Sequence, residues 1–152
     1  YDLSLIGLRP TLVYGPYRES GSASAYAQVI EGPARENAVT VGPSDFVFDW
    51  QYASDAGAAF YGATLARESE LSHSVYNVCG ERATLAEVAD VVRTYLPDAD
   101  IKLTDEGTAV WNHHMEMSAA KEELGYDPEY DLEHGVKSYI DVVRENAGLD
   151  PV

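Results

Sequence analysis

The stretch LIGLRPTLVYGPYRES, residues 5–20, places an apolar run directly before two proline turns. Residues 3–9 are dense enough in apolar side chains to form a strand buried on both faces, as in a parallel sheet. Pro10 removes an N–H from the hydrogen-bond ladder of such a strand, and Gly15 lets the backbone approach a neighbour closely. We therefore expect a core strand that ends in a tight turn, followed by a polar loop.

Strands and helices are expected to alternate along the rest of the chain. Short apolar runs predict strands at residues 39–41, 46–50, 74–78 and 101–103. Helices are expected over residues 22–32 and after the capping residues Ser54, Thr84, Ser118 and Asp131. The helix after Thr84 is the best defined, because Thr84 and Glu87 form a capping box and an apolar stripe follows. This alternation predicts an α/β layered fold.

The composition excludes several kinds of partner. The chain has 26 acidic and 10 basic residues and a formal net charge of −16, which repels nucleic acids and anionic membranes. Only three of the basic residues are lysines. An acidic, lysine-poor surface suits a cytoplasm of very high salt, so a halophilic source is the leading hypothesis and an ordinary acidic protein the alternative. With no signal segment or long apolar run in the sequence, we expect a cytoplasmic location.

Four stretches, in order, resemble the extended short-chain dehydrogenases, the NAD-dependent epimerase/dehydratase family. They are LRPTLVYGP (8–16), DWQYASDAGAAFYGAT (49–64), VYNVCGERATLAEVADVV (75–92) and MEMSAAKEELGYDPEYDLEHGVKSYID (115–141). The resemblance implies that residues 1–152 form the C-terminal part of a Rossmann-like enzyme, with late core strands and a small substrate-binding α/β subdomain. The family's glycine-rich turn and Tyr-x-x-x-Lys pair do not occur in these residues. We therefore expect a piece of a longer enzyme, inactive by itself and without catalytic residues of its own.

The resemblance also implies a cofactor, NAD or NADP, bound mainly by the missing N-terminal half. By the same resemblance, the turn at Arg9 brings the following backbone beside the nicotinamide carboxamide. The expected cofactor contacts are Pro10, Thr11, Leu12 and Val13. The alternative is a turn with a purely structural role.

Two positions bear on the substrate that the resemblance implies. Nucleotide-sugar enzymes of the family usually carry Asn where this chain has Leu12, and Arg where it has Phe48. Neither Leu nor Phe can donate a hydrogen bond to a diphosphate, and each lost bond is worth about 1.5–3 kcal/mol. We expect instead a free sugar, a sugar acid or a small hydroxy acid. The expected substrate contacts are Tyr14, Arg18, Ser22, Ser24, Trp50, Tyr52, Trp111 and His113.

For several of these side chains, a structural role is the alternative to contact with substrate. Ser22 is suited to capping a helix, Arg18 to solvent, and Trp50 and Tyr52 to core packing. Asp55 is expected in a structural role in the first turn of a helix. No metal site is expected, because adjacent histidines at 113 and 114 point in different directions. The single cysteine, Cys79, excludes an internal disulfide and is expected to be a buried apolar residue at a strand end.

Three functions remain open at this point. The first is the substrate-binding half of an NAD(P)-dependent epimerase, dehydratase or dehydrogenase. The second is a non-catalytic binding or regulatory module that retains the family's substrate domain. The third is an independent small domain whose likeness to the family is only architectural. A small-molecule substrate is the expected partner, and a homodimer is left open.

Overall fold

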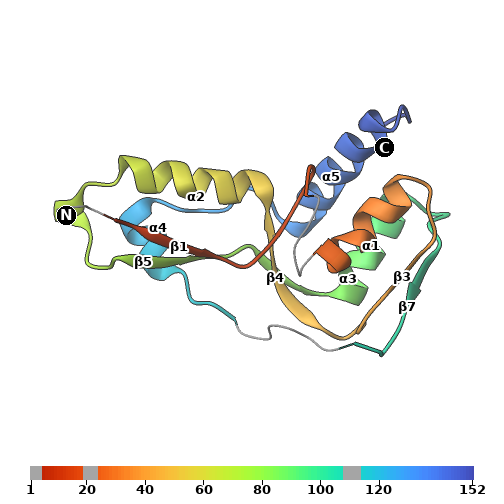
Figure 1. The fold of residues 1–152 in the computed structure, drawn as a ribbon, viewed down its shortest axis with the longest axis horizontal. Coiled ribbons are helices and arrows are strands. Elements are labelled where there is room, and N and C mark those ends of the chain that lie inside the picture. The colour runs from red at the N-terminus through yellow and green to blue at the C-terminus, as the bar shows by residue number, and fades with distance from the viewer. Residues whose placement is uncertain (1–4, 19–23, 108–113) are drawn as a thin grey trace.

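The computed structural model describes residues 5–18, 24–107 and 114–152 of the chain (Figure 1). It has the predicted α/β character, with helices packed beside short strands. The elements in chain order are β1 (Gly7–Pro10), β2 (Leu12–Tyr14), α1 (Ser24–Ala34), β3 (Val39–Val41), β4 (Val47–Tyr52), α2 (Ala53–Leu65), the short helix η1 (Glu68–Glu70), β5 (Val75–Val78), β6 (Glu81–Thr84), α3 (Leu85–Tyr95), β7 (Ile101–Leu103), α4 (Ser118–Leu124) and α5 (Leu132–Asn146).

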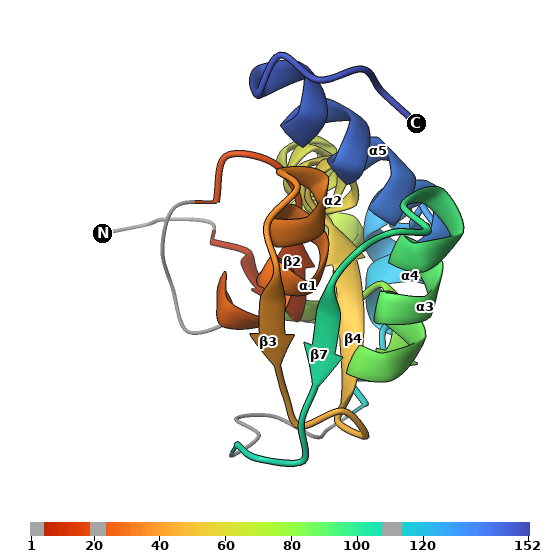
Figure 2. The same ribbon diagram turned by 90° about the vertical axis from the view of Figure 1, so that its right-hand side faces the viewer.

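The strands form three small sheets. β1 pairs with β5 in parallel, and β3 pairs with β7 in parallel at the end of the molecule that faces the viewer in Figure 2. In the third sheet β4 lies in the middle, parallel to β2 and antiparallel to β6. The sequence analysis missed β6, because Glu81–Thr84 is a short, mostly polar run without an apolar pattern. The central strand β4 therefore joins β2, near the start of the chain, to β6, in its second half.

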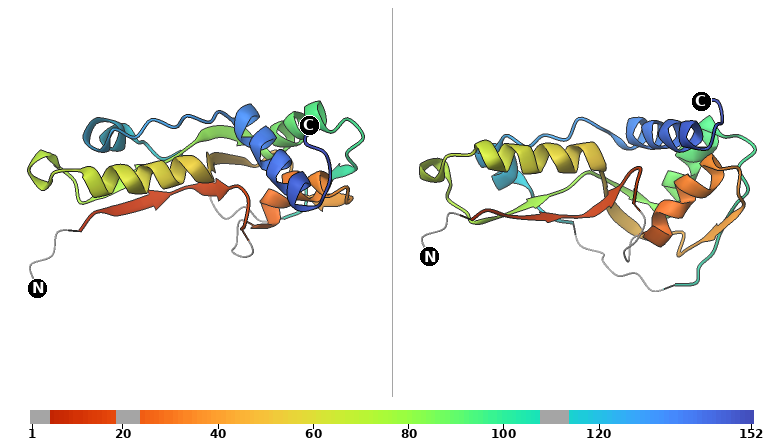
Figure 3. Two further views of the ribbon diagram at one scale, coloured as in Figure 1. Left: turned by 90° about the horizontal axis from the view of Figure 1, so that it is seen from above. Right: turned by 45° about the horizontal axis from the view of Figure 1, so that its top comes forward.

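Two hydrophobic clusters hold the elements together. The larger one packs α1, α3 and α5 against β2 and β4, and it contains the apolar stripes predicted for α3 and α5. The smaller one joins α2, β5 and α4 through Ala59, Tyr76 and Leu124. Both views of Figure 3 show the result, an elongated molecule with β1, β5, α2 and α4 at one end and α1, α3 and α5 at the other.

The strand predicted for residues 3–9 is only partly confirmed. β1 begins at Gly7, and it is not buried on both faces, because Arg9 and Pro10 are exposed. Within the described part of the chain, β5 is the only strand beside it. Pro10 also does not end the extended chain, since β2 begins two residues later. It marks instead the point where the chain leaves β5 and begins to pair with β4.

Three predicted helix boundaries are wrong. α1 continues past Gly32 through Pro33, because the N–H of Arg35 reaches back to the carbonyls of residues 31 and 32 and closes the last turn. Ser54 and Ser118 do not cap their helices but lie within the first turn of α2 and α4. Serine is common at both kinds of position, so the residue type alone did not separate them.

The predicted helix starts at Thr84 and Asp131 are confirmed, whereas the start expected at residue 22 lies outside the described residues. The hydroxyl of Thr84 accepts the N–H of Glu87 at 3.1 Å, and the Thr84 N–H donates to the Glu87 carboxylate at 2.7 Å. Asp131 caps α5 by accepting the N–H of His134 at 2.8 Å. These contacts span three residues, which is why the local sequence was sufficient to predict them.

Asp55 has the structural role that was expected of it. Its carboxylate is buried in the first turn of α2 and accepts the backbone N–H groups of Glu129 and Tyr130 at 2.9 and 3.2 Å. It therefore ties the start of α2 to the segment that leads into α5.

Glu123 of α4 forms a second tether. Its carboxylate accepts the hydroxyl of Tyr76 at 2.5 Å and the N–H of Ser72 at 2.8 Å, and it lies 2.8 Å from Nδ1 of His73. The Tyr76 hydrogen bond is the main reason that the pKa of Glu123 falls from 4.5 to about 2. A carboxylate with a lower pKa in the folded state stabilises the fold only while it is ionised.

We expect the Glu123→Gln variant to lose part of the acid sensitivity of the fold. In the parent chain this tether contributes fully above about pH 4.5 and is lost as the pH falls from there towards 2. Thermal unfolding measured across this range checks it. Glu122→Gln is the matched control, because Glu122 is exposed and makes no hydrogen bond or ion pair with the residues described. Equal acid sensitivity of the Glu123→Gln variant and the parent chain would contradict the assignment.

Candidate functional site

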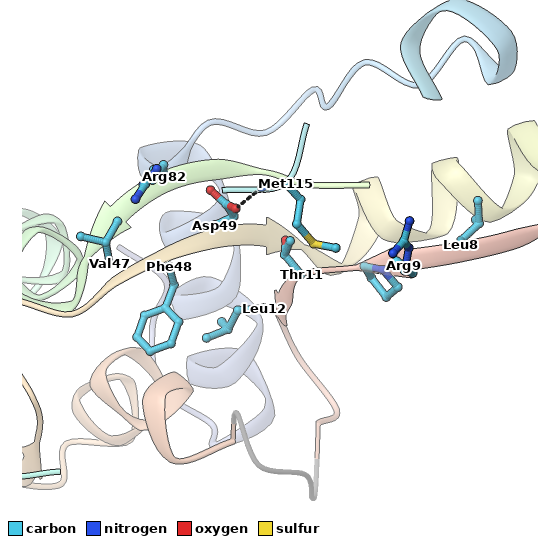
Figure 4. Close-up of a pocket in the computed structure, with 10 residues that line it drawn as sticks. Leu8, Arg9, Thr11, Leu12, Val47, Phe48, Asp49, Arg82 and Met115 are labelled. Atoms are coloured by element: carbon cyan, nitrogen blue, oxygen red, sulfur yellow. Dashed lines mark hydrogen bonds between the residues drawn. The ribbon is translucent and has the colours of Figure 1, made fainter. Parts of the chain in front are cut away.

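A pocket of about 480 Å³ lies between β4 and the segment where the chain passes from β1 into β2. β2 pairs with β4 from Leu12 opposite Trp50 onward, whereas the residues before Leu12 pair with β5. Residues 47–49 of β4 consequently have no described strand on that side, and the gap forms the pocket. Its lining residues, drawn in Figure 4, are Leu8, Arg9, Pro10, Thr11, Leu12, Val47, Phe48, Asp49, Arg82 and Met115.

The walls of this pocket are mostly apolar. Figure 4 shows Leu12 and Phe48 on one side of β4, and Asp49 and Met115 on the other. The side chains alternate because successive residues of a strand point to opposite faces. A concave, apolar pocket of this volume with a few polar groups is typical of a small-molecule site.

Two polar groups in the pocket are incompletely bonded. The hydroxyl oxygen of Thr11 is buried and has no hydrogen-bond partner in the described structure. The carboxylate of Asp49, a residue only 6% exposed, lies 3.4 Å from Nδ1 of His114 and 3.4 Å from the N–H of Met115. Both distances are long for bonds to a charged group. Thr11 and Asp49 therefore keep hydrogen-bonding capacity that the described residues do not use.

The two arginines of the pocket are also unpaired. Arg9 and Arg82 are exposed and form no ion pair or hydrogen bond with the described residues. Elsewhere the arginines have partners: Arg18 donates to a backbone carbonyl, and Arg35, Arg67, Arg93 and Arg144 form ion pairs with acidic side chains. The pocket thus holds the free guanidinium groups of the described chain.

Three of the four residues expected to contact the cofactor lie on the pocket wall. They are Pro10, Thr11 and Leu12. Val13 lies beyond the pocket, and its carbonyl accepts a hydrogen bond from Arg18. The buried, unbonded hydroxyl of Thr11 fits a ligand that presents an amide, such as a nicotinamide carboxamide. The residues present are therefore compatible with the expected cofactor.

Three of the residues expected to contact the substrate lie in the hydrophobic core. Tyr14, Trp50 and Tyr52 are almost fully buried, and the Tyr14 ring centre lies 5.6 Å from that of Trp50 and 5.5 Å from that of Tyr52. Burial raises the pKa of Tyr14 well above its usual value. The indole of Trp50 donates to the Ala83 carbonyl at 3.1 Å, and Tyr52 bonds Ser138 at 2.8 Å. None of the three lines the pocket, and their contact with substrate stays a prediction.

The remaining expected contacts are not brought to this pocket. Arg18 and Ser24 line a separate, more polar pocket of about 510 Å³ beside α1 and α5. There Tyr139 donates to the carboxylate of Glu31 at 2.9 Å. Ser22, Trp111 and His113 lie outside the described residues.

Asp49 and Arg82 are pocket residues that sequence reasoning missed. The only charged residue in the mostly apolar strand β4 was a usable signal for Asp49. Arg82 gave no such signal, because it reaches the pocket only through the pairing of β6 with β4. In the part of the chain that is described, no group of three or more His, Cys, Asp or Glu side chains is placed to hold a metal ion. The described helices also include none with the length and apolarity to cross a membrane.

Comparison with protein families places the chain in a known family. The model of the NAD dependent epimerase/dehydratase family matches residues 1–79, which are 79 of the 152 residues. Comparison with curated proteins gives no match.

Solved structures of similar fold cover nearly the whole chain. An L-threonine dehydrogenase from Cupriavidus necator has a TM-score of 0.81 at 18% identity, over 91% of this chain and 47% of that one. A UDP-glucose 4-epimerase from Thermotoga maritima has a TM-score of 0.74 at 24% identity, over 91% and 45%. An ADP-L-glycero-D-manno-heptose-6-epimerase from Helicobacter pylori has a TM-score of 0.71 at 25% identity, over 91% and 43%. The chain thus spans about half the length of these proteins and matches the C-terminal half of their Rossmann-like fold.

Proposed function

Because the chain belongs to the NAD-dependent epimerase/dehydratase family, we propose that it is the substrate-binding portion of an NAD(P)-dependent epimerase, dehydratase or dehydrogenase. NAD or NADP is the cofactor typical of this family. In this proposal the dinucleotide-binding half lies elsewhere in the full-length protein, and residues 1–152 shape the substrate pocket. Family membership removes the hypothesis that the likeness is merely architectural.

The observation that carries the proposal is the pocket between β4 and the strand switch at Pro10. Pro10, Thr11 and Leu12, which the resemblance assigns to the cofactor, line this pocket, and its volume is suitable for a small molecule. Bound there, NAD(P) would supply reversible two-electron oxidation of a substrate carbinol. The Thr11 hydroxyl would bond its carboxamide, while Pro10 and Leu12 would exclude water from that side.

The proposed substrate is a free sugar, a sugar acid or a small hydroxy acid. Leu12 and Phe48 are 3% and 4% exposed and offer no hydrogen-bond donor to a diphosphate. The similar structures include L-threonine dehydrogenases, whose named substrate is a small hydroxy acid, as well as enzymes of nucleotide sugars. A small molecule is the proposed partner, with no role for nucleic acid or membrane. A homodimer, a cytoplasmic location and a high-salt source stay predictions from the sequence.

The full-length protein, the product of the complete open reading frame that contains these residues, tests this proposal. We expect it to convert free sugars, sugar acids or small hydroxy acids more efficiently than UDP- or dTDP-sugars. Absorbance of the reduced nicotinamide measures the rate of a dehydrogenase. Chromatographic separation of the products measures the rate of an epimerase or dehydratase, because in these two reactions the cofactor is reoxidised within each turnover. Efficient use of a nucleotide sugar would contradict the substrate class. Absence of any turnover would favour the alternative, a non-catalytic binding or regulatory module.

A further inference from the structure

We propose that Arg82 and Asp49 together recognise a carboxylate substrate that carries a hydroxyl or ammonium group beside the carboxylate. In this arrangement Arg82 binds the carboxylate, and Asp49 accepts a hydrogen bond from the neighbouring donor. The inference rests on the proposed function, because it places the substrate in the same pocket. It excludes free sugars from the proposed substrates and leaves the sugar acids and the small hydroxy acids.

The two side chains are neighbours on one face of a sheet. Asp49 of β4 and Arg82 of β6 are directly opposed in an antiparallel pair. In such pairs the Cβ atoms are about 4.5–5.5 Å apart and point to the same side. Figure 4 shows both at the same end of the pocket, whereas Arg9 lies at the opposite end, beyond Thr11. Carboxylate and guanidinium are therefore placed to contact adjacent atoms of one small ligand.

Asp49 needs a donor that the described residues do not supply well. A carboxylate buried to this degree is costly unless it is fully hydrogen-bonded. Its two contacts, with His114 and Met115, are both 3.4 Å long. Nor does Arg82 complete it, because no ion pair within 4.0 Å joins the two side chains. A ligand O–H or N–H at this end of the pocket would satisfy the carboxylate.

Arg82 has no ion-pair partner among the described residues, which is unusual in a chain with so many acidic side chains. With 26 acidic residues against 10 basic ones, an arginine on the surface readily finds a partner, as four others do. Arg82 stays unpaired next to a carboxylate, which keeps its two-pronged guanidinium available for a planar anion. Asp49 beside it disfavours a doubly charged phosphate through repulsion. A single carboxylate with an adjacent donor fits both groups.

Calorimetric titration of the full-length protein with matched probes tests this inference. D-glucuronate is compared with D-glucose, and L-threonine with its alcohol L-threoninol, so that each pair differs in the carboxylate. We expect the carboxylate probes to bind more tightly, and Arg82→Gln to weaken them about 10- to 100-fold while leaving the neutral probes unchanged. Arg67→Gln is the matched control, because Arg67 is exposed, directly precedes η1 and forms an ion pair with Glu70.

Each other outcome has a defined meaning. Neutral and carboxylate probes that bind alike, or equal effects of Arg82→Gln and Arg67→Gln, would overturn this inference and leave the proposed function standing. Lower melting temperatures for Arg82→Gln and Asp49→Asn without a change in affinity would show that the two side chains stabilise the fold instead of binding substrate, and would overturn this inference. A failure of all four probes to bind would overturn this inference, and the turnover assay of the full-length protein would then decide the proposed function separately.

Discussion

In dilute buffer, the chain by itself is expected to self-associate or to stay partly unfolded, and molar salt is expected to make it compact. The reason lies in the apolar surface of α2 and the β1–β5 sheet. Five large apolar residues there or beside it are 43–74% exposed: Leu5, Phe60, Tyr61, Leu65 and Val75. A contiguous exposed patch of several hundred Å² is unusual for a stable monomer. β1 also presents an edge that no described strand covers.

Salt acts on this surface in two ways. It screens the repulsion among the charges that sum to −16, and it strengthens the burial of apolar groups. Sedimentation and circular dichroism, with and without molar salt, measure association and folding separately. A monodisperse monomer that melts cooperatively in low salt would show that these 152 residues form a complete domain.

A pair of substitutions locates the responsible surface. Tyr61→Glu is expected to reduce self-association, because Tyr61 is 68% exposed on α2. Tyr17→Glu is the matched control, since Tyr17 is 81% exposed and lines the separate pocket beside α1. Equal effects of the two variants would mean that overall charge, rather than the α2 surface, controls association.

Replacing Gly80 by alanine is expected to cost about 3–5 kcal/mol of unfolding free energy or to prevent folding. A Cβ atom at this position would lie 1.8 Å from the carbonyl oxygen of Trp50 and 2.7 Å from the Cα of Gln51. Both atoms belong to the backbone of β4, which is held by β2 on one side and β6 on the other. The strand therefore cannot move aside without breaking its pairing.

Gly57→Ala is the matched control for this substitution. Gly57 lies within α2, and a Cβ there would meet no atom within 4 Å. Alanine favours the helix over glycine by about 0.5–1 kcal/mol, so this variant should be slightly more stable than the parent chain. Urea unfolding in molar salt, followed by circular dichroism, compares the two. Equal midpoints for the Gly80 and Gly57 variants would contradict the close packing of Gly80 against β4.

Much of the secondary structure could be predicted from neighbouring residues alone. The caps at Thr84 and Asp131 join groups three residues apart, and the apolar stripes of α3 and α5 follow from the helical period. Where a stop or cap residue had two common uses, as at Pro33 and Ser54, the boundary was predicted incorrectly. Such positions are decided by which neighbours the rest of the fold supplies.

The residues of the candidate site likewise include some that the sequence predicted and some whose role it could not decide. Resemblance to a family was sufficient to predict Pro10, Thr11 and Leu12 on its wall, because these residues are consecutive in one motif. It could not decide whether Trp50 and Tyr52 face a ligand or the core, since an aromatic side chain suits both. The packing of β2 and β4 against α5 places them in the core.

The sequence by itself determined the α/β class, the helix caps at Thr84 and Asp131 and the family, since each depends on residues close together in the chain. Only the tertiary structure decided that Asp49 and Arg82, 33 positions apart, share one end of a pocket. Their meeting depends on the register in which β6 pairs with β4, and a shift of one residue would turn either side chain to the other face. That register is set by the packing of the whole chain, which no short stretch of sequence encodes.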